Sequence, residues 1–122
     1  MEEKDALTEK IISCCFKVHS ELGPGFNEKI YHNALGLALE ETGLKYETEK
    51  EFSVLFDGKK VGAFRLDLIV QNKVIVEIKA VMGNMPEVFR YQLLSYLKAS
   101  GLQTGLLINF GDKSCYVKRF VV

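Results

Sequence analysis

The fold of this chain is decided by residues 64–80, which read FRLDLIVQNKVIVEIKA. Apolar residues alternate with other residues on both sides of Gln71-Asn72-Lys73, which is typical of two half-buried strands joined by a tight turn. The first strand, over residues 61–70, is expected to turn inward a face formed by Phe64, Leu66, Leu68 and Val70. The second strand, over residues 74–80, is expected to do the same with Val74, Val76 and Ile78.

Three ionisable residues interrupt this apolar stretch, namely Asp67, Glu77 and Lys79. Because side chains alternate along a strand, Asp67 faces away from its apolar neighbours, and Glu77 and Lys79 share one face of the next strand. If the turn has three residues, Val70 pairs with Val74 and the two acids lie opposite each other, with Cβ atoms about 5 Å apart. A two-residue turn would shift the register by one and separate the acids unless a bulge restored the pairing.

Charges in such an apolar setting need an ion pair, a bound cation or solvent, because unpaired buried charge is costly. Two adjacent carboxylates repel each other unless a cation lies between them, and oxygen-only ligation suits Mg²⁺ or Mn²⁺. The pair Asp67 and Glu77 therefore suits a divalent-cation site. The alternative is an exposed sheet face on which Lys79 forms a salt bridge of little energetic value.

Helical spacing of apolar residues predicts helices over residues 5–21, 27–42 and 86–100. Glycine follows the end of each of these segments, as is common at helix C-termini. Asn27 suits the N-cap of the second helix. The second helix is expected to bury Ile30, Ala34, Leu37 and Ala38.

Further strands are expected over about residues 52–56, 104–109 and 114–121, and Asp57-Gly58 is a strong hairpin turn signal. The resulting order, α-α-β-β-β-α-β-β, predicts an α/β fold with a single mixed sheet flanked by helices. The helix after the third strand is expected to cross over to a parallel strand. With 122 residues, the chain fits one domain over residues 1–122.

Composition limits the class of protein. The 16 basic residues balance the 16 acidic ones, which argues against a strong non-specific nucleic-acid binder but allows a nuclease with a local basic patch. The three cysteines include no C-x-x-C pair, so a disulfide framework or a zinc site is not expected. No apolar run is long enough to span a bilayer, and the acidic start over residues 1–5 is unlike a secretory signal. We therefore expect a soluble cytoplasmic protein without a membrane partner.

The spacing of the ionisable residues resembles a known signature. Asp67 followed by Glu77-Ile78-Lys79 resembles the D…(E/D)-x-K motif of the PD-(D/E)XK nuclease superfamily, and the expected element order matches that superfamily's core. The proline of the motif is absent, because Leu66 precedes Asp67. That position is loose in the superfamily, so the departure matters little.

Four further segments narrow the resemblance. Residues 25–31 read G-x-x-E-x-x-Y after Leu22-Gly23-Pro24, and the others read EIKAV at 77–81, QLLSYL at 92–97 and LINFG at 107–111. Together they are similar to the GxxExxY protein family, small prokaryotic proteins placed in the same superfamily. The similarity extends from about Ile11 to Arg119.

The resemblance implies metal-dependent hydrolysis of phosphodiester bonds in nucleic acid, with DNA favoured over RNA. The implied catalytic residues are Asp67, Glu77, Lys79 and Gln92. The implied ligands of Mg²⁺ or Mn²⁺ are Glu28, Asp67, Glu77 and the Ile78 carbonyl, and the implied substrate-binding residues are Tyr31 and Tyr96. A lysine beside two carboxylates suits an electrostatic role better than that of a base.

Several of these roles have simpler alternatives. Glu28 would join the metal if its helix packs over the acidic face of the sheet, and is otherwise a first-turn glutamate that favours the helix N-terminus. Gln92 is alternatively a polar residue beside a buried stripe, and Tyr31 a packing aromatic with a hydrogen-bonded hydroxyl. The whole chain is alternatively a catalytically weak or silent accessory module that binds nucleic acid or protein. Hydrolysis of another phosphate-bearing substrate and association with a second copy or a protein partner stay open.

Overall fold

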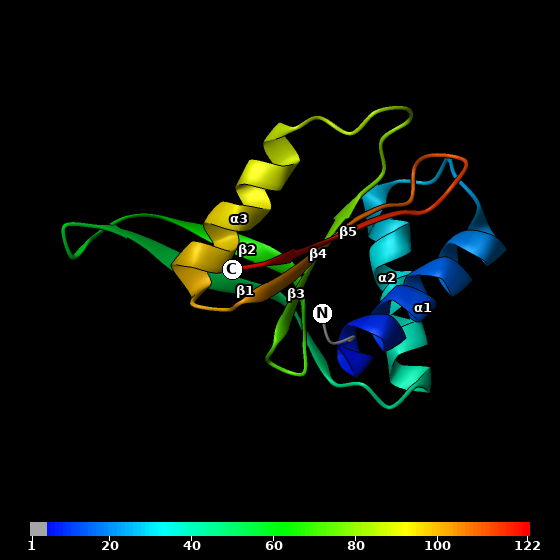
Figure 1. Cartoon of the computed structure of the whole chain (residues 1–122), viewed down its shortest axis with the longest axis horizontal. Coiled ribbons are helices and arrows are strands. Elements are labelled where there is room, and N and C mark those ends of the chain that lie inside the picture. Colours follow the sequence, from blue (N-terminus) through cyan, green and yellow to red (C-terminus); the bar gives the residue numbers. More distant parts are fainter. Residues whose placement is uncertain (1–4) are drawn as a thin grey trace.

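A five-stranded mixed sheet forms the centre of the structure, a computed structural model that describes residues 5–122 (Figure 1). The strands lie side by side in chain order as β1 (Tyr46–Phe56), β2 (Lys59–Val70), β3 (Val74–Lys79), β4 (Thr104–Asn109) and β5 (Tyr116–Val121). Helices α1 (Ala6–Leu22) and α2 (Glu28–Glu41) precede the sheet, and α3 (Val88–Ser100) connects β3 to β4. β3 and β4 are parallel, and the other neighbouring strands are antiparallel. The predicted element order, mixed sheet and crossover are confirmed. Residues 1–4 of the acidic N-terminus lie outside the described residues.

The helices cover both faces of the sheet (Figure 1). α1 and α2 pack on one face, against side chains such as Val76, Ile78 and Ile108. α3 packs on the other face, where Leu93 and Leu97 meet the remaining side chains of the strands. Most of the central strand β3 is therefore buried on both sides, which explains its nearly continuous apolar sequence.

The inward face of α2 differs from the expected one. Ile30 is 39% exposed and Leu37 is 63% exposed, whereas Tyr31, Leu35 and Leu39 are fully buried. Ala38 is buried as predicted, and Ala34 is partly buried against the same core. The buried face of α2 is therefore shifted from the predicted one, so that Tyr31, Leu35 and Leu39 rather than Ile30 and Leu37 meet the core. The predicted N-cap is present, since Asn27 Oδ1 accepts a hydrogen bond from the backbone nitrogen of Ile30 at 3.2 Å.

The turn between β2 and β3 has the three-residue form. Val70 pairs with Val74. Gln71 and Asn72 both have φ of 55°, in the left-handed region that such tight turns use. The register that places Asp67 beside the acid-bearing end of β3 is therefore present.

The predicted single inward face of β2 is wrong. Leu66 packs beneath α3, whereas Leu68 packs against α1 and α2, so the side-chain alternation is interrupted at Asp67. The neighbouring position in β1 is Glu49, whose φ of 55° is unusual for a strand residue. Neither Asp67 nor Glu49 belongs to the regular ladder between β1 and β2. The two strands kink together at this point.

Two further expectations, on membrane spans and on disulfides, concern residues 5–122 of the structure. Within that range, no helix has the length and apolar character needed to cross a membrane. Cys14, Cys15 and Cys115 are all free thiols, in agreement with the expected lack of a disulfide.

Gly111 provides a test of the packing between the loop after β4 and the end of β3. A Cβ atom at this position would collide with the backbone nitrogen of Val81 and would lie 2.5 Å from the carbonyl carbon of Ala80. We expect Gly111→Ala to lower the free energy of unfolding by about 3 kcal/mol, because main chain rather than a flexible side chain must move. Urea denaturation measures this change. Gly62→Ala is the matched control, since its Cβ meets no atom within 4 Å. Equal stability of the two variants would contradict the prediction.

Candidate functional site

The two predicted acids meet where β2 and β3 separate. Regular pairing of these strands extends as far as Leu68 and Val76. Beyond that pair, Asp67 Oδ2 accepts a hydrogen bond from the backbone nitrogen of Ile78 at 2.7 Å, and the backbone nitrogen of Asp67 donates to Glu77 Oε1 at 3.1 Å. Each carboxylate therefore replaces a backbone carbonyl as the acceptor for the opposite strand.

Burial changes the protonation of this acid pair. Glu77 is only 5% exposed, and burial, followed by the charge of Asp67, raises its pKa to about 8. Burial also raises the pKa of Asp67, although the hydrogen bond from the Ile78 nitrogen opposes the change. Without a cation, the pair therefore holds one proton near neutral pH.

Each acid keeps one oxygen for a further partner. Among the described residues, Asp67 Oδ1 and Glu77 Oε2 accept no hydrogen bond. The burial of Glu77 also contradicts the alternative of an exposed face with a salt bridge. In the described part of the chain, no ion pair within 4.0 Å joins either acid to Lys79.

Lys79 is held close to the acids by an aromatic ring. Its Nζ lies 4.3 Å from the centroid of the Phe89 ring, a cation-π contact between β3 and α3. Its positive charge lowers the pKa of both Asp67 and Glu77. The ammonium group is thus near the acid pair without being neutralised by direct contact, so it can meet an incoming anion.

The end of β3 is fixed by a residue to which the sequence analysis gave no role. Asn109, 1% exposed, donates to the carbonyl oxygen of Val81 at 2.8 Å and accepts from the Val81 nitrogen at 2.9 Å. The neighbouring Phe110 nitrogen donates to the carbonyl oxygen of Lys79 at 2.9 Å. These contacts hold the backbone on which Lys79 stands. The available sequence signal was a polar residue at the end of an apolar strand.

A pocket of about 220 Å³ opens beside Asp67 and is lined by Glu28, Lys29, His32, Glu49, Asp67 and Ile78. Helix α2 packs on the face of β3 opposite to Glu77, so it does not cover the acidic face as the simplest metal role of Glu28 required. Its first turn nevertheless reaches this pocket, and the charge of Glu28 contributes to the raised pKa of Glu77. Glu28 therefore lies near enough to act on the acid pair.

His32 and Glu49 are pocket residues that the sequence analysis did not select. His32 Nε2 lies 3.0 Å from the carbonyl oxygen of Asp67 and 3.9 Å from Glu49 Oε1. A carbonyl only accepts hydrogen bonds, so Nε2 carries the proton. The Nδ1 atom is buried and has no hydrogen-bond partner among the described residues. His32 thus holds the main chain at the kink that presents Asp67. No sequence signal pointed to this role, because His32 has no spacing to other residues that is typical of a metal site.

Tyr96 lies on the α3 side of the acid pair, whereas Tyr31 lies away from it. The ring of Tyr96 stacks on Phe64 at 4.4 Å, and its pKa is raised by burial and by the charges of Glu77 and Asp67. Gln92, one turn earlier on the same helix face, is partly buried.

Tyr31 is fully buried and stacks on Phe110 at 4.9 Å. Its hydroxyl donates to the carbonyl oxygen of Gly23 at 2.6 Å and accepts from the Phe26 nitrogen at 3.2 Å. This leaves no surface of Tyr31 for a substrate.

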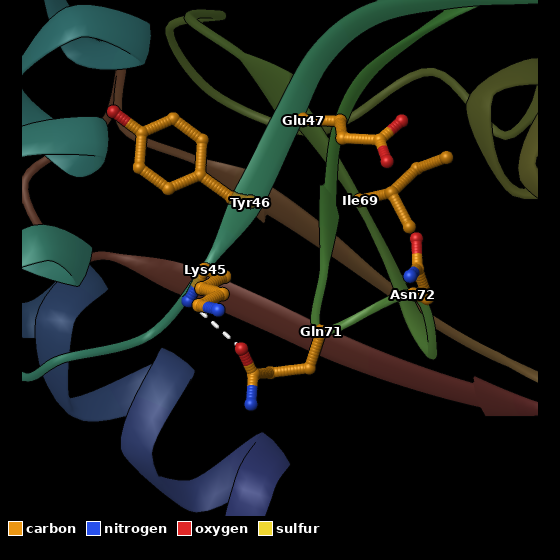
Figure 2. A pocket seen from close by; sticks show the side chains of 6 residues that line it. All are labelled: Lys45, Tyr46, Glu47, Ile69, Gln71 and Asn72. Atoms are coloured by element: carbon orange, nitrogen blue, oxygen red, sulfur yellow. Dashed lines mark hydrogen bonds between the residues drawn. The ribbon is translucent and has the colours of Figure 1, made fainter.

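A second, larger hollow of about 370 Å³ lies at the opposite end of β3, beside the β2–β3 turn (Figure 2). In Figure 2 its side chains do not converge on one point, and Tyr46 and Glu47 point in different directions. The amide of Gln71 is used within the protein, since its oxygen accepts from the Lys45 nitrogen at 2.8 Å. The chemistry of the acid pair, rather than the size of a hollow, therefore identifies the candidate site.

Comparison with known proteins shows the superfamily of the chain. The family model described as PD-(D/E)XK nuclease superfamily matches residues 5–120. The chain belongs to the PD-(D/E)XK nuclease superfamily. The expected superfamily is thus confirmed, while the narrower GxxExxY family stays a prediction.

Two solved structures resemble this PD-(D/E)XK protein. The crystal structure of SSO0001 matches 76% of the chain with a TM-score of 0.60 and 24% identity, and the match covers 48% of SSO0001. The chain therefore spans about half the length of that protein, and the likeness shows the fold alone. An alkaline exonuclease (LHK-Exo) from Laribacter hongkongensis matches 99% of the chain and 72% of its own length, with a TM-score of 0.47 and 11% identity. No curated protein matches this chain.

PD-(D/E)XK nucleases generally use divalent metals, and the residues at this site fit one. Within residues 5–122, no three His, Cys, Asp or Glu side chains are grouped around a common point. Mg²⁺, however, is commonly bound by one or two carboxylates with water and substrate oxygens as the other ligands. Asp67, Glu77 and the Ile78 carbonyl offer such an oxygen-only donor set.

The raised pKa of Glu77 predicts how stability changes with pH in the absence of metal. The folded protein keeps the Glu77 proton up to about pH 8, whereas the unfolded chain releases it near the ordinary value of 4.5. Stability is therefore highest below pH 4.5 and falls as the pH rises through 8. We expect Glu77 to reduce the stability of the wild type by about 4 kcal/mol between pH 5 and pH 9 in the presence of chelator. Glu77→Gln should lose much less.

Urea denaturation across a pH series measures this difference. Glu51→Gln, which replaces an exposed carboxylate of β1, is the control and should follow the wild type. Parallel curves for Glu77→Gln and the wild type would show that Glu77 is not protonated in the folded protein.

Proposed function

We propose that this chain is a divalent-metal-dependent nuclease that hydrolyses phosphodiester bonds of nucleic acid, with DNA favoured over RNA. The observation that carries the proposal is the buried pair of Asp67 and Glu77, joined across separating strands with Lys79 beside it. Superfamily membership supports it. The proposal includes one domain over residues 1–122, a cytoplasmic location and membership of the GxxExxY family, which the motif segments support.

Asp67, Glu77 and the carbonyl of Ile78 would hold Mg²⁺ or Mn²⁺, with Glu28 as a further carboxylate. The position of Glu28 in the pocket beside Asp67 supports its role as a fourth ligand. When bound, the ion would polarise a phosphoryl oxygen and lower the pKa of a water molecule. For binding, the acid pair must release its shared proton, so affinity for the ion should rise with pH up to about 8.

Lys79 would stabilise negative charge on the pentacovalent transition state or orient the attacking water. Phe89 holds its ammonium group, and the contacts of Asn109 and Phe110 fix the backbone that carries it. Such prior positioning favours the transition state because little reorganisation is needed during the reaction.

Tyr96 and Gln92 would act from α3 on the substrate side of the acid pair. The raised pKa of Tyr96 keeps its hydroxyl protonated, so it can donate a hydrogen bond to a phosphate oxygen. Gln92 would support the site or contact the substrate from one turn away. Because Tyr31 is fully buried, we assign it no substrate contact.

The balanced charge of the chain favours a second candidate, a catalytically silent module on the same fold that binds nucleic acid or protein. This module would bind its partner equally well after loss of Lys79, whereas the nuclease would lose catalysis.

Cleavage assays with Lys79→Ala separate the two candidates. We expect the wild type to cleave a panel of labelled DNA and RNA only with Mn²⁺ or Mg²⁺, and Lys79→Ala to be at least about 100-fold slower, because a preorganised charge is lost. Lys73→Ala, in the exposed β2–β3 turn, is the matched control and should keep full activity. Circular dichroism verifies folding.

Two results would oppose the nuclease proposal. Cleavage that persists in Lys79→Ala would indicate a contaminant or another site. A wild type that binds Mn²⁺ in calorimetry but cleaves nothing in the panel would favour the silent module.

Glu28→Gln tests the fourth metal ligand. If Glu28 binds the ion, the variant should bind Mn²⁺ about ten-fold more weakly in calorimetry, as loss of one carboxylate reduces the attraction for a cation. Glu21→Gln, an exposed glutamate of α1, is the control and should bind Mn²⁺ as the wild type does. Unchanged affinity with a small loss of stability, about 0.5 kcal/mol, would instead identify Glu28 as a residue that favours the helix N-terminus.

A further inference from the structure

The β1–β2 hairpin projects beyond the helices as an arm, which we define as residues 53–62 (Figure 1). Four large apolar side chains lie exposed on it: Val54 is 37%, Leu55 61%, Phe56 68% and Val61 64% exposed. The turn Asp57-Gly58 at its tip has φ of 51° and 75°, as a tight hairpin turn requires. Apolar side chains gathered at the end of a projecting element are typical of a contact surface.

The charge of the arm indicates the chemistry of its partner. Lys59 and Lys60 are both exposed, and in the ladder they stand opposite Phe56 and Leu55. Asp57 is the single acid of the arm. Exposed aromatic and apolar groups interleaved with lysines suit single-stranded nucleic acid, whose bases stack on rings and whose phosphates attract ammonium groups. Tip-to-tip association of two copies would instead bring four lysines together, which like-charge repulsion opposes.

A row of aromatic rings leads from the base of the arm toward the acid pair. Phe52 stacks on Phe64 with centroids 5.8 Å apart, and Phe64 stacks on Tyr96 at 4.4 Å. Tyr96 lies within the electrostatic influence of Glu77 and Asp67. The arm and the acid pair are thus joined by β2, and three stacked rings lie between them.

We propose that the arm binds a single-stranded segment of the nucleic acid whose cleaved bond lies at the acid pair, with Phe56 stacked on a base and Lys59 and Lys60 at phosphates. This inference rests on the proposed function, because it assigns the same substrate to a second contact. Lys59 and Asp67 are eight positions apart on β2. At about 3.3 Å per residue they lie roughly 26 Å apart, which corresponds to about eight nucleotides at the stacked spacing of about 3.4 Å and to fewer when the single strand is extended.

Binding in the absence of metal tests the arm independently of cleavage. Fluorescence anisotropy with a labelled single-stranded DNA of 20 nucleotides, in EDTA, measures affinity over a range of salt concentrations. We expect Phe56→Ala to bind about ten-fold more weakly with an unchanged salt dependence, because stacking is lost but no charge. Lys60→Ala should reduce the slope of log affinity against log salt by about 0.7, because one phosphate contact is lost.

Phe16→Ala and Lys10→Ala are the matched controls. Both residues are exposed on α1, at the end of the molecule opposite to the arm (Figure 1). Both variants should bind DNA as the wild type does. Phe56 is 68% exposed, so Phe56→Ala should fold normally, which circular dichroism verifies.

Substrate length gives a second measurement. Phe56→Ala should reduce kcat/KM about ten-fold for a 20-nucleotide substrate and leave it unchanged for a substrate of about three nucleotides, which is too short to reach from the acid pair to Phe56 even when extended.

The outcomes separate this inference from the nuclease proposal. Arm-dependent binding without any cleavage would support the arm and oppose the nuclease. Cleavage with no effect of Phe56→Ala or Lys60→Ala on DNA affinity would overturn the arm alone. Absence of DNA binding by the wild type would overturn it too. Analytical ultracentrifugation that shows a wild-type dimer and a Phe56→Ala monomer, with unchanged DNA affinity, would overturn it in favour of a second copy as the partner.

Discussion

The arrangement of this protein depends on one substitution of hydrogen-bond acceptors between β2 and β3. Where the strands separate, the carboxylates of Asp67 and Glu77 accept the N–H groups that backbone carbonyls would otherwise accept. The sheet can therefore open without leaving buried donors unpaired, which would be costly. The pocket beside Asp67 lies at this opening. Glu77 is buried at the same place, and this burial raises its pKa so that the acid pair keeps one proton. The hydrogen bonds of the two carboxylates thus account both for the separation of β2 from β3 and for the position of the acid pair.

Local patterns in the sequence predicted the sheet and much of the candidate site. Alternating apolar residues and a three-residue turn determined the register of Val70 and Val74, and that register brings Asp67 to the end of β3 where Glu77 and Lys79 share a face. Helix boundaries and most strand boundaries followed from periodicity and glycine positions, because these signals depend only on neighbouring residues, but β1 begins at Tyr46, six residues before the predicted start. The superfamily resemblance rested on the same few residues and was confirmed.

Features that depend on distant contacts were not predictable in this way. Helix α2 buries Tyr31, which stacks on Phe110 far along the chain, whereas the predicted Ile30 and Leu37 are exposed. His32 contacts Asp67 across 35 positions, and Asn109 contacts Val81 across 28. The kink shared by Glu49 and Asp67 has no local signal, since it arises only when two strands pair. Long-range packing thus set the details that position the acids.

The buried carboxyl of Glu77 also has an evolutionary consequence. A neutral amide at this position would fold without the penalty that burial places on a negative charge. Substitutions that leave function and stability intact accumulate during evolution, and those that increase stability are tolerated even more readily. In a lineage that had no use for the site, Glu77 would therefore be among the first residues to be replaced. The proposed function, rather than the fold, would therefore account for a glutamate at this position.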